Sequence, residues 1–127
     1  MQGAAQREFD PDLTVAPATR AGGPVDLVHL RRFTLGNRAL EREVLQLFAD
    51  QAPVILKRME LACTDKAWLD AAHTLKGSAG AVGAHAVARA AAQAELLRGD
   101  ETSWPDGIAR VRLALDEACS FIGAGVL

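Results

Sequence analysis

The sequence has few aromatic residues and no long hydrophobic run. Among its 127 residues there is no tyrosine, and aromatic residues make up only 5% of the chain. No stretch approaches the roughly 18 consecutive apolar residues that a membrane-spanning helix needs. The N-terminus also lacks the apolar segment of a signal peptide. These absences argue against a membrane partner and predict a cytoplasmic protein.

Neither positive nor negative charge is in clear excess, and cysteine is also scarce. The formal net charge is -2, which provides no basic surface for nucleic acid. Only two cysteines occur, Cys63 and Cys119, and neither lies in a Cys/His spacing typical of zinc sites. We therefore expect no nucleic-acid partner, no metal site and no cofactor, with both thiols in the core or partly buried.

What the chain does contain favours helix. Its length is that of one domain, and Ala, Leu, Arg and Glu, which are strong helix formers, dominate after Pro24. Residues 1–24 instead combine prolines and glycines with small and polar side chains, which predicts a flexible N-terminal arm. The predicted fold class is all-α, with residues 25–124 as the folded unit.

Apolar residues recur at helical spacing in five segments. A short helix is expected after Asp26, which is suited to cap it, and a last helix begins at Ser103-Trp104-Pro105, where an early proline is favourable. The predicted helices span 26–34, 37–62, 65–83, 84–97 and 103–122. Four substantial helices joined by short loops predict an antiparallel four-helix bundle with an additional short N-terminal helix. Homodimerisation is open, because dimerising kinase helices can also place a histidine on a bundle surface. Since four helices in one chain can close their own core, we expect a monomer.

The second predicted helix contains Pro53, which removes one backbone donor and crowds the preceding turn. We expect a kink at this proline and not two separate helices. Its predicted core positions are spaced by three, four and seven residues: Leu40, Val44, Leu47, Phe48, Ile55, Met59 and Ala62.

The third predicted helix has one apolar face and one face of small residues around a histidine. At about 100° per residue, one narrow sector contains a stripe that should face the core. Its members are Trp68, Ala72, Leu75, Ala79 and Val82. His73, Gly77, Gly80 and Ala84 fall on the opposite side, with Lys76 on the flank between the two faces. His73 is therefore predicted to be exposed.

Two glycines inside this helix need an explanation, because each costs about 1 kcal/mol relative to alanine. Gly77 lies one turn after His73, so its missing side chain leaves space in which another protein could approach the imidazole. A glycine in a helix more commonly permits close packing of a neighbouring helix. The combination with His73 and Lys76 favours the first explanation here.

The same residues suggest phosphoryl chemistry. An exposed imidazole is largely neutral around pH 7, and hence nucleophilic, while Lys76 is a flexible cation within reach of a phosphate on His73. The sequence contains no Ser/His/Asp set, no paired catalytic acids and no Gly-rich phosphate loop. The chain should not act as an enzyme by itself.

The segment HTLKGSAGAVG at residues 73–83 resembles the H-x-L-K-G-x(5)-G signature of histidine phosphotransfer (HPt) domains. FTLGN at residues 33–37, with Leu40, Glu43, Leu47 and Phe48 after it, resembles the lead-in to the second helix of that family. The resemblance extends over roughly residues 26–123.

The resemblance implies that His73 accepts a phosphoryl group from the aspartyl phosphate of a receiver domain and passes it to another receiver in a multistep phosphorelay. Lys76 would assist the phosphate, and Gly77 would leave clearance for the receiver. The receiver would supply Mg²⁺, and a hybrid histidine kinase would lie upstream. Weaker candidates for partner contact are Gly80, Ala84 and His85.

Three alternatives remain open. The same bundle could bind a receiver or a kinase as an adaptor or inhibitor without being phosphorylated. It could be part of a histidine kinase or phosphatase, although the chain lacks room and motifs for an ATP-binding domain. His29 or His85 could be a second acceptor or a metal ligand, but neither has the His-Lys-Gly setting, and we expect surface or edge positions for both.

Overall fold

The structure, a computed structural model, describes residues 23–125. It contains helices and no strand within that range, which confirms the predicted all-α class. The helices are α1 (Leu27–Thr34), α2 (Arg38–Leu61), α3 (Asp65–Val82), α4 (His85–Glu95), the short 3-10 helix η2 (Glu101–Ser103) and α5 (Trp104–Gly123). Of the predicted N-terminal arm, residues 1–22 lie outside the described part of the chain.

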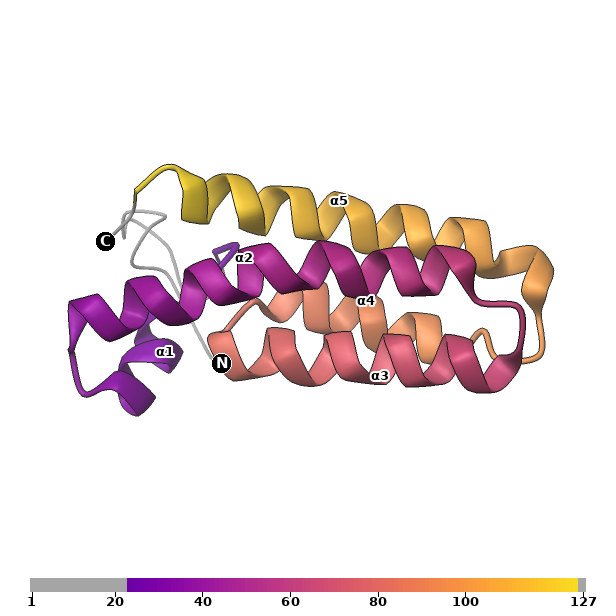
Figure 1. Ribbon diagram of the computed structural model, residues 1–127, viewed down its shortest axis with the longest axis horizontal. Helices are drawn as coiled ribbons and strands as arrows, with labels where there is room; N and C mark the ends of the chain where they lie inside the picture. Colours follow the sequence, from indigo (N-terminus) through magenta and orange to yellow (C-terminus); the bar gives the residue numbers. More distant parts are fainter. Residues whose placement is uncertain (1–22, 126–127) are drawn as a thin grey trace, which may run out of the picture.

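Helices α2 to α5 form the four-helix bundle, and α1 covers one end of it (Figure 1). Helix α3 packs between α2 and α4, and α5 closes the bundle by contacting both α2 and α4. The core is built largely from alanine on α3 and α4 and from larger aliphatic side chains on α2 and α5. Small residues allow α3 and α4 to approach closely, which fixes the surface around His73.

Helix α2 runs without interruption through Pro53, so the prediction of one helix is confirmed. The kink itself stays a prediction. Asn37 caps the helix, because its side-chain oxygen accepts from the Leu40 amide at 3.0 Å. The predicted core positions Leu40 and Leu47 are wrong, since both side chains are exposed. The buried side chains of α2, Leu45 among them, lie along an adjacent line of the helix, so the apolar surface of α2 is wider than its core face.

A stacked pair of tryptophans joins three helices at the end of the bundle where α3 begins. The ring centroids of Trp68 and Trp104 lie 4.5 Å apart with an interplanar angle of 3°. Trp68 Nε1 donates to the Ala94 carbonyl at 2.7 Å, and Trp104 Nε1 donates to the Leu97 carbonyl at 2.9 Å. Both indoles are buried with their N–H groups satisfied, which holds the end of α4 against α3 and α5.

The two cysteines differ in their exposure to solvent. Cys119 is partly buried in α5, where burial and the nearby charge of Asp116 raise the pKa of its thiol. Cys63 is exposed, so the prediction of a buried or semi-buried thiol is wrong there. It lies in the turn between α2 and α3, next to Thr64, which caps α3 at the surface by accepting from the Ala67 amide.

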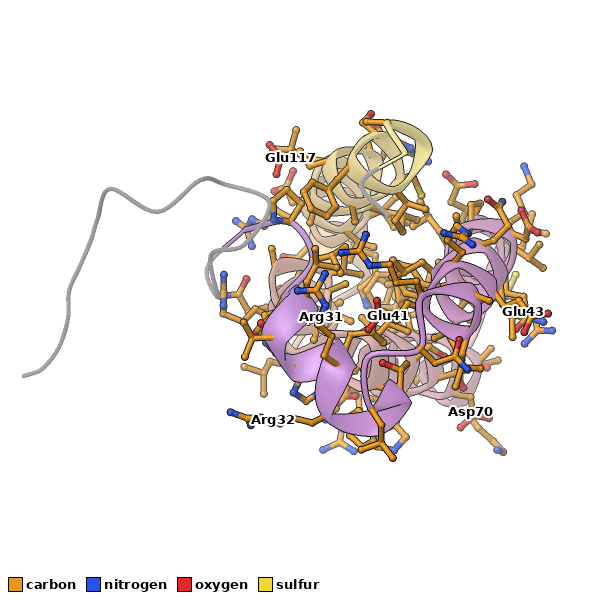
Figure 2. The ribbon with its side chains drawn as sticks, turned by 90° about the vertical axis from the view of Figure 1, so that its left-hand side faces the viewer. Arg31, Arg32, Glu41, Glu43, Asp70 and Glu117 are labelled. Carbon is orange, nitrogen blue, oxygen red and sulfur yellow. The ribbon has the colours of Figure 1, made fainter. Side chains whose placement is uncertain are left out.

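Helix α1 is held to the bundle by two carboxylates. Asp26 caps α1 as predicted, accepting from the His29 amide at 3.0 Å, and its own amide donates to the Gly83 carbonyl at 2.8 Å. The second, Glu41 on α2, has an exposure of 0%. It accepts from the Thr34 hydroxyl at 2.6 Å and lies 3.6 Å from the Arg31 Nε (Figure 2). These contacts fix α1 against α2.

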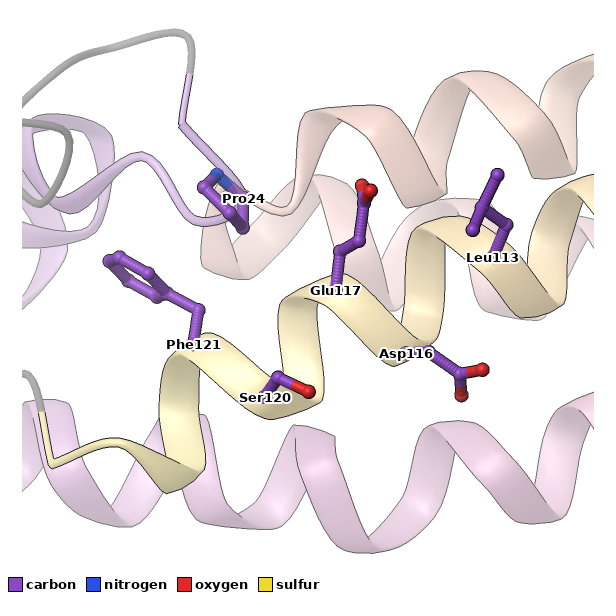
Figure 3. Close-up of a pocket in the computed structure, with 6 residues that line it drawn as sticks. All are labelled: Pro24, Leu113, Asp116, Glu117, Ser120 and Phe121. Carbon is purple, nitrogen blue, oxygen red and sulfur yellow. The ribbon is translucent and has the colours of Figure 1, made fainter.

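Helix α5 has a shallow groove on its outer side, beside the first residues of the described chain (Figure 3). The groove is lined by Pro24, Leu113, Asp116, Glu117, Ser120 and Phe121. This surface lies on α5 and includes no residue of α3, so it is separate from His73.

Candidate phosphoryl-acceptor site

Helix α3 presents His73 as its sequence predicts. The predicted apolar stripe, from Trp68 to Val82, is entirely buried. His73 lies on the opposite side with 75% of its side chain exposed. The two faces of one amphipathic helix thus separate the core from the candidate site.

A carboxylate on α4 contacts both His73 and Lys76, the two predicted site residues that carry charge or a nucleophile. Glu95 Oε2 lies 3.2 Å from His73 Nδ1, and Glu95 Oε1 accepts from Lys76 Nζ at 3.2 Å. The Glu95 side chain is only 20% exposed, whereas both its partners lie closer to the surface. One partly buried carboxylate therefore positions both the imidazole and the ammonium.

With Nδ1 directed at Glu95, the imidazole has its Nε2 available. In the tautomer that donates Nδ1–H to the carboxylate, Nε2 carries the lone pair. His73 borders an open depression on the surface of α3 and α4, lined by Leu69, Asp70, His73, Thr74 and Glu95. The nucleophilic nitrogen is thus presented to an approaching molecule and not to the interior.

Three other side chains near this depression are engaged with each other or with backbone. Lys66 Nζ donates to Asp70 Oδ2 at 2.8 Å, and this hydrogen bond and the Asp70 charge raise the pKa of Lys66. Thr74 donates its hydroxyl proton to the Asp70 carbonyl at 2.8 Å. Lys76, whose contact is with Glu95, is therefore the better placed cation for a group bound to His73.

The glycines of α3 face open space. A Cβ built on Gly77 would meet no atom within 4 Å, and the same is true of Gly80. The common explanation, that a helical glycine permits close packing of a neighbouring helix, therefore does not apply at either position. Gly77 is exposed and Gly80 half-buried, so the surface next to His73 is smooth and unobstructed.

The prediction that Ala84 lies on the exposed face of His73 and contacts a partner is wrong. Its exposure is 0%, so it cannot contact a partner protein. Helix α3 ends at Val82, and Gly83 adopts a φ of 82°, which reverses the chain direction. Ala84 then donates its amide to the Ala79 carbonyl at 2.8 Å and packs into the core. Extending the helical period beyond Gly83 placed Ala84 incorrectly on the His73 face.

His85, at the start of α4, and His29, on α1, lie at the edge of the bundle, as predicted. His85 Nε2 is 3.0 Å from Asp26 Oδ2, and the two histidine rings meet edge to face with centroids 5.5 Å apart. His73 lies nine residues before the end of α3, which is roughly 14 Å along the helix axis. The contact with Asp26 gives His85 a structural role in holding α1, and its part in partner binding stays a prediction.

Sequence reasoning missed Glu95. A signal for it was present: His73 and Glu95 are each eleven positions from Ala84, where the chain turns. Because α3 and α4 are antiparallel, residues equally far from the turn lie side by side.

Among residues 23–125 no three His, Cys, Asp or Glu side chains gather as a metal ion would require, and no helix there is both long and apolar enough to cross a membrane.

Comparison with known families supports the interpretation of this surface. A family model for the Hpt domain matches residues 43–121, which include most of α2 and all of α3 and α4. No curated protein and no solved structure gave a significant match. The matched segment covers more than half of the chain and includes His73, Lys76, Gly77 and Glu95. The chain therefore belongs to the Hpt domain family, whose members act as histidine phosphocarriers in two-component phosphorelays.

Proposed function

We propose that His73 accepts a phosphoryl group from the aspartyl phosphate of one receiver domain and passes it to a second receiver. The observation that carries this proposal is the exposed His73 ring, whose Nδ1 is directed at Glu95 beside the open surface of Gly77. A hybrid histidine kinase is the proposed upstream source. A cytoplasmic location also stays a prediction.

In the proposed reaction, the Nε2 lone pair of His73 attacks phosphorus. An N–P bond forms, the P–O bond of the acyl phosphate breaks, and the receiver's aspartate leaves as a carboxylate. The ring becomes positively charged as the bond forms, with the proton remaining on Nδ1. Glu95 Oε2, at 3.2 Å from Nδ1, is placed to stabilise that charge. The second transfer is the reverse step with a different receiver.

Lys76 has a separate role in this proposal. Its ammonium is 3.2 Å from Glu95 and on the same side of α3 as His73, so it can offset the charge of a phosphoryl group on Nε2. The acceptor site then needs no metal of its own, and we place the Mg²⁺ on the receiver that holds the aspartyl phosphate. This division explains why the chain presents a nucleophile without a closed catalytic pocket.

The direct test is incubation of the full chain with a receiver domain carrying labelled phosphate. We expect acid-labile, base-stable label on the wild-type chain and none on His73→Gln. His29→Gln is a matched control, since it changes a histidine on α1, outside the site, and it should retain the label. Absence of label on the wild-type chain with every receiver of the source organism would refute the proposal. Unchanged signalling in a His73→Ala strain would favour the adaptor alternative.

Glu95→Gln tests the proposed charge stabilisation. The amide keeps the shape of the side chain but loses the negative charge that faces the ring in the transition state. We expect transfer to slow by about 10- to 100-fold, in the range typical of groups that stabilise developing charge. Rapid-quench measurement of the transfer rate gives the result. A rate equal to that of the wild type would show that Glu95 has only a structural role.

A further inference from the structure

The charged side chains closest to His73 neutralise one another. Lys66 Nζ lies 2.8 Å from Asp70 Oδ2, and Lys76 Nζ lies 3.2 Å from Glu95 Oε1. The two cations beside the imidazole are thus matched by two carboxylates. A charged partner that approaches from a distance is therefore attracted or repelled by side chains further from His73.

Those more distant charges are unevenly distributed over the bundle. Helix α1 and residues 85–98, which include α4, contain four arginines and one acid, Glu95. Residues 100–123, which include η2 and α5, contain five acids and two arginines. The whole chain has a net charge of -2, but α1 and α4 carry an excess of positive charge.

Two of these arginines, Arg32 and Arg89, have exposed side chains. Neither side chain forms an ion pair or a hydrogen bond with another residue in the range 23–125. Arg31, in contrast, lies 3.6 Å from the carboxylate of the buried Glu41. The charges of Arg32 and Arg89 are therefore available to an external partner, and we call these two residues the arginine rim.

Arg89 lies on the outer surface of the helix next to His73. It is exposed on α4, opposite the face that packs into the core. Because α3 and α4 are antiparallel around Ala84, Arg89 is level with Ala79, six residues or about 9 Å along the helix axis from His73. A partner that reaches His73 over α3 and α4 therefore passes close to Arg89.

Arg32 lies at the end of the same side of the bundle. Figure 2 looks along the bundle from the end that α1 covers, and Arg32 points to the lower side of this view. Helix α3 forms the lower side of the bundle in Figure 1, and Figure 2 shows Asp70, three residues before His73, on that side as well. Arg32 is therefore at the α1 end of the side that presents His73.

A receiver centred on His73 is large enough to reach both arginines. A protein–protein interface of standard size covers about 800 Å² on each partner, which corresponds to a disc of about 16 Å radius. The level of Arg89 is about 9 Å from His73 along the helix axis, and the end of α3, where α1 packs, is about 14 Å away. Arg89 therefore falls inside such an interface and Arg32 at its edge.

The receiver that phosphotransfer requires is anionic where it meets His73. A phosphoryl group carries about two negative charges at pH 7, and Mg²⁺ is bound by carboxylates in addition to phosphate oxygens. Together these groups carry more negative charge than one Mg²⁺ can offset. Building on the proposed function, we propose that the arginine rim attracts this acidic surface of the receiver and so sets how fast the two proteins associate.

Transfer kinetics at low and high ionic strength test the arginine rim. The probe is the labelled phosphorylated receiver that transfers most rapidly to the wild-type chain of 127 residues. At low ionic strength, Arg32→Glu/Arg89→Glu should lower the second-order rate constant by at least about tenfold, because repulsion replaces attraction. At high ionic strength the difference should shrink, since salt screens surface charges. The rate constant at saturating receiver should stay unchanged, because the groups that contact His73 are intact.

Two matched variants separate the position of the charges from their number. Arg58→Glu/Arg110→Glu changes the net charge by the same amount at exposed arginines of α2 and α5, and its rate constant should stay within about twofold of the wild type. Arg32→Lys/Arg89→Lys keeps both positive charges and should transfer at the wild-type rate. Circular dichroism of each variant checks that its helices are intact.

The outcomes separate the arginine rim from phosphotransfer itself. Equal rate constants for Arg32→Glu/Arg89→Glu and the wild type at low ionic strength would overturn the role of the rim and leave the function of His73 intact. Equal slowing by Arg58→Glu/Arg110→Glu would also overturn it, since net charge would then be responsible. If phosphatidylserine vesicles bind the wild type but not the rim variant, and transfer is unchanged, the rim serves a membrane and not a receiver. A wild-type chain that accepts no label would refute the proposed function, and the role of the rim with it.

Discussion

The glycines of this bundle fall into two groups with opposite surroundings. Gly77 and Gly80, on the surface of α3, have no atom within 4 Å of the position where a Cβ would lie. At Gly83 such a Cβ would lie 2.7 Å from the Asp26 carbonyl oxygen, and at Gly107 it would lie 2.9 Å from Leu97 Cδ1. At Gly83 the Asp26 backbone excludes a side chain, and at Gly107 a side chain would have to displace the end of Leu97. Packing within the chain does not require glycine at Gly77 or Gly80, although each glycine lowers the stability of the helix. We therefore expect these two glycines to make room for a molecule that approaches from outside.

The largest effect should come from Gly83→Ala. The residue has a φ of 82°, which an alanine adopts only with strain, and the added methyl group would overlap the Asp26 backbone. We expect a loss of about 2–4 kcal/mol in the free energy of unfolding. Urea denaturation followed by circular dichroism measures it. A loss smaller than that of an ordinary surface substitution would show that α1 and the turn move apart easily.

The next largest effect should be on transfer and not on stability. Gly77→Leu adds a bulky side chain one turn from His73, where the open surface accepts it without internal overlap. We expect phosphoryl transfer from a receiver to slow by about 10- to 100-fold, because the reacting atoms are held too far apart.

Rapid-quench kinetics measures this change, with Ala109→Leu on the exposed side of α5 as the matched control. The control should transfer at the wild-type rate. Equal rates for all three chains would mean that the open surface at Gly77 serves no approaching partner.

The smallest effect should be a gain in the stability of the fold. Gly80→Ala puts a good helix former into open space, so the free energy of unfolding should rise by about 0.5–1 kcal/mol. The sign is opposite to that expected at Gly83, and the same urea experiment compares the two variants. A loss of stability at Gly80 would remove the distinction between the two groups of glycines.

The sequence was sufficient to predict the features that depend on local periodicity and capping. The buried stripe of α3, the exposure of His73, the cap at Asp26 and the continuity of α2 through Pro53 agree with the structure. Each depends on residues within a few turns of one another, where the helical period and the capping side chain decide the outcome.

Features that depend on how helices meet were missed or mispredicted. Ala84 was placed on the wrong face because the helical period ends at Gly83. Leu40 and Leu47 were assigned to the core, since apolar spacing does not say which of two adjacent lines on a helix is buried. Glu95 was not identified, because its contact with His73 crosses 22 positions of sequence and depends on the register of α3 against α4.

The stacked indoles at the end of α3 provide an optical signal for the acceptor site. The chain contains no tyrosine, so Trp68 and Trp104 account for its intrinsic near-ultraviolet emission. Trp68 is hydrogen-bonded to the Ala94 carbonyl, and the next residue is the carboxylate that contacts both His73 and Lys76. Under the proposed function, a phosphoryl group that draws Lys76 away from Glu95 would release the residue that follows this carbonyl. We therefore expect tryptophan emission to change when phosphate arrives on or leaves His73.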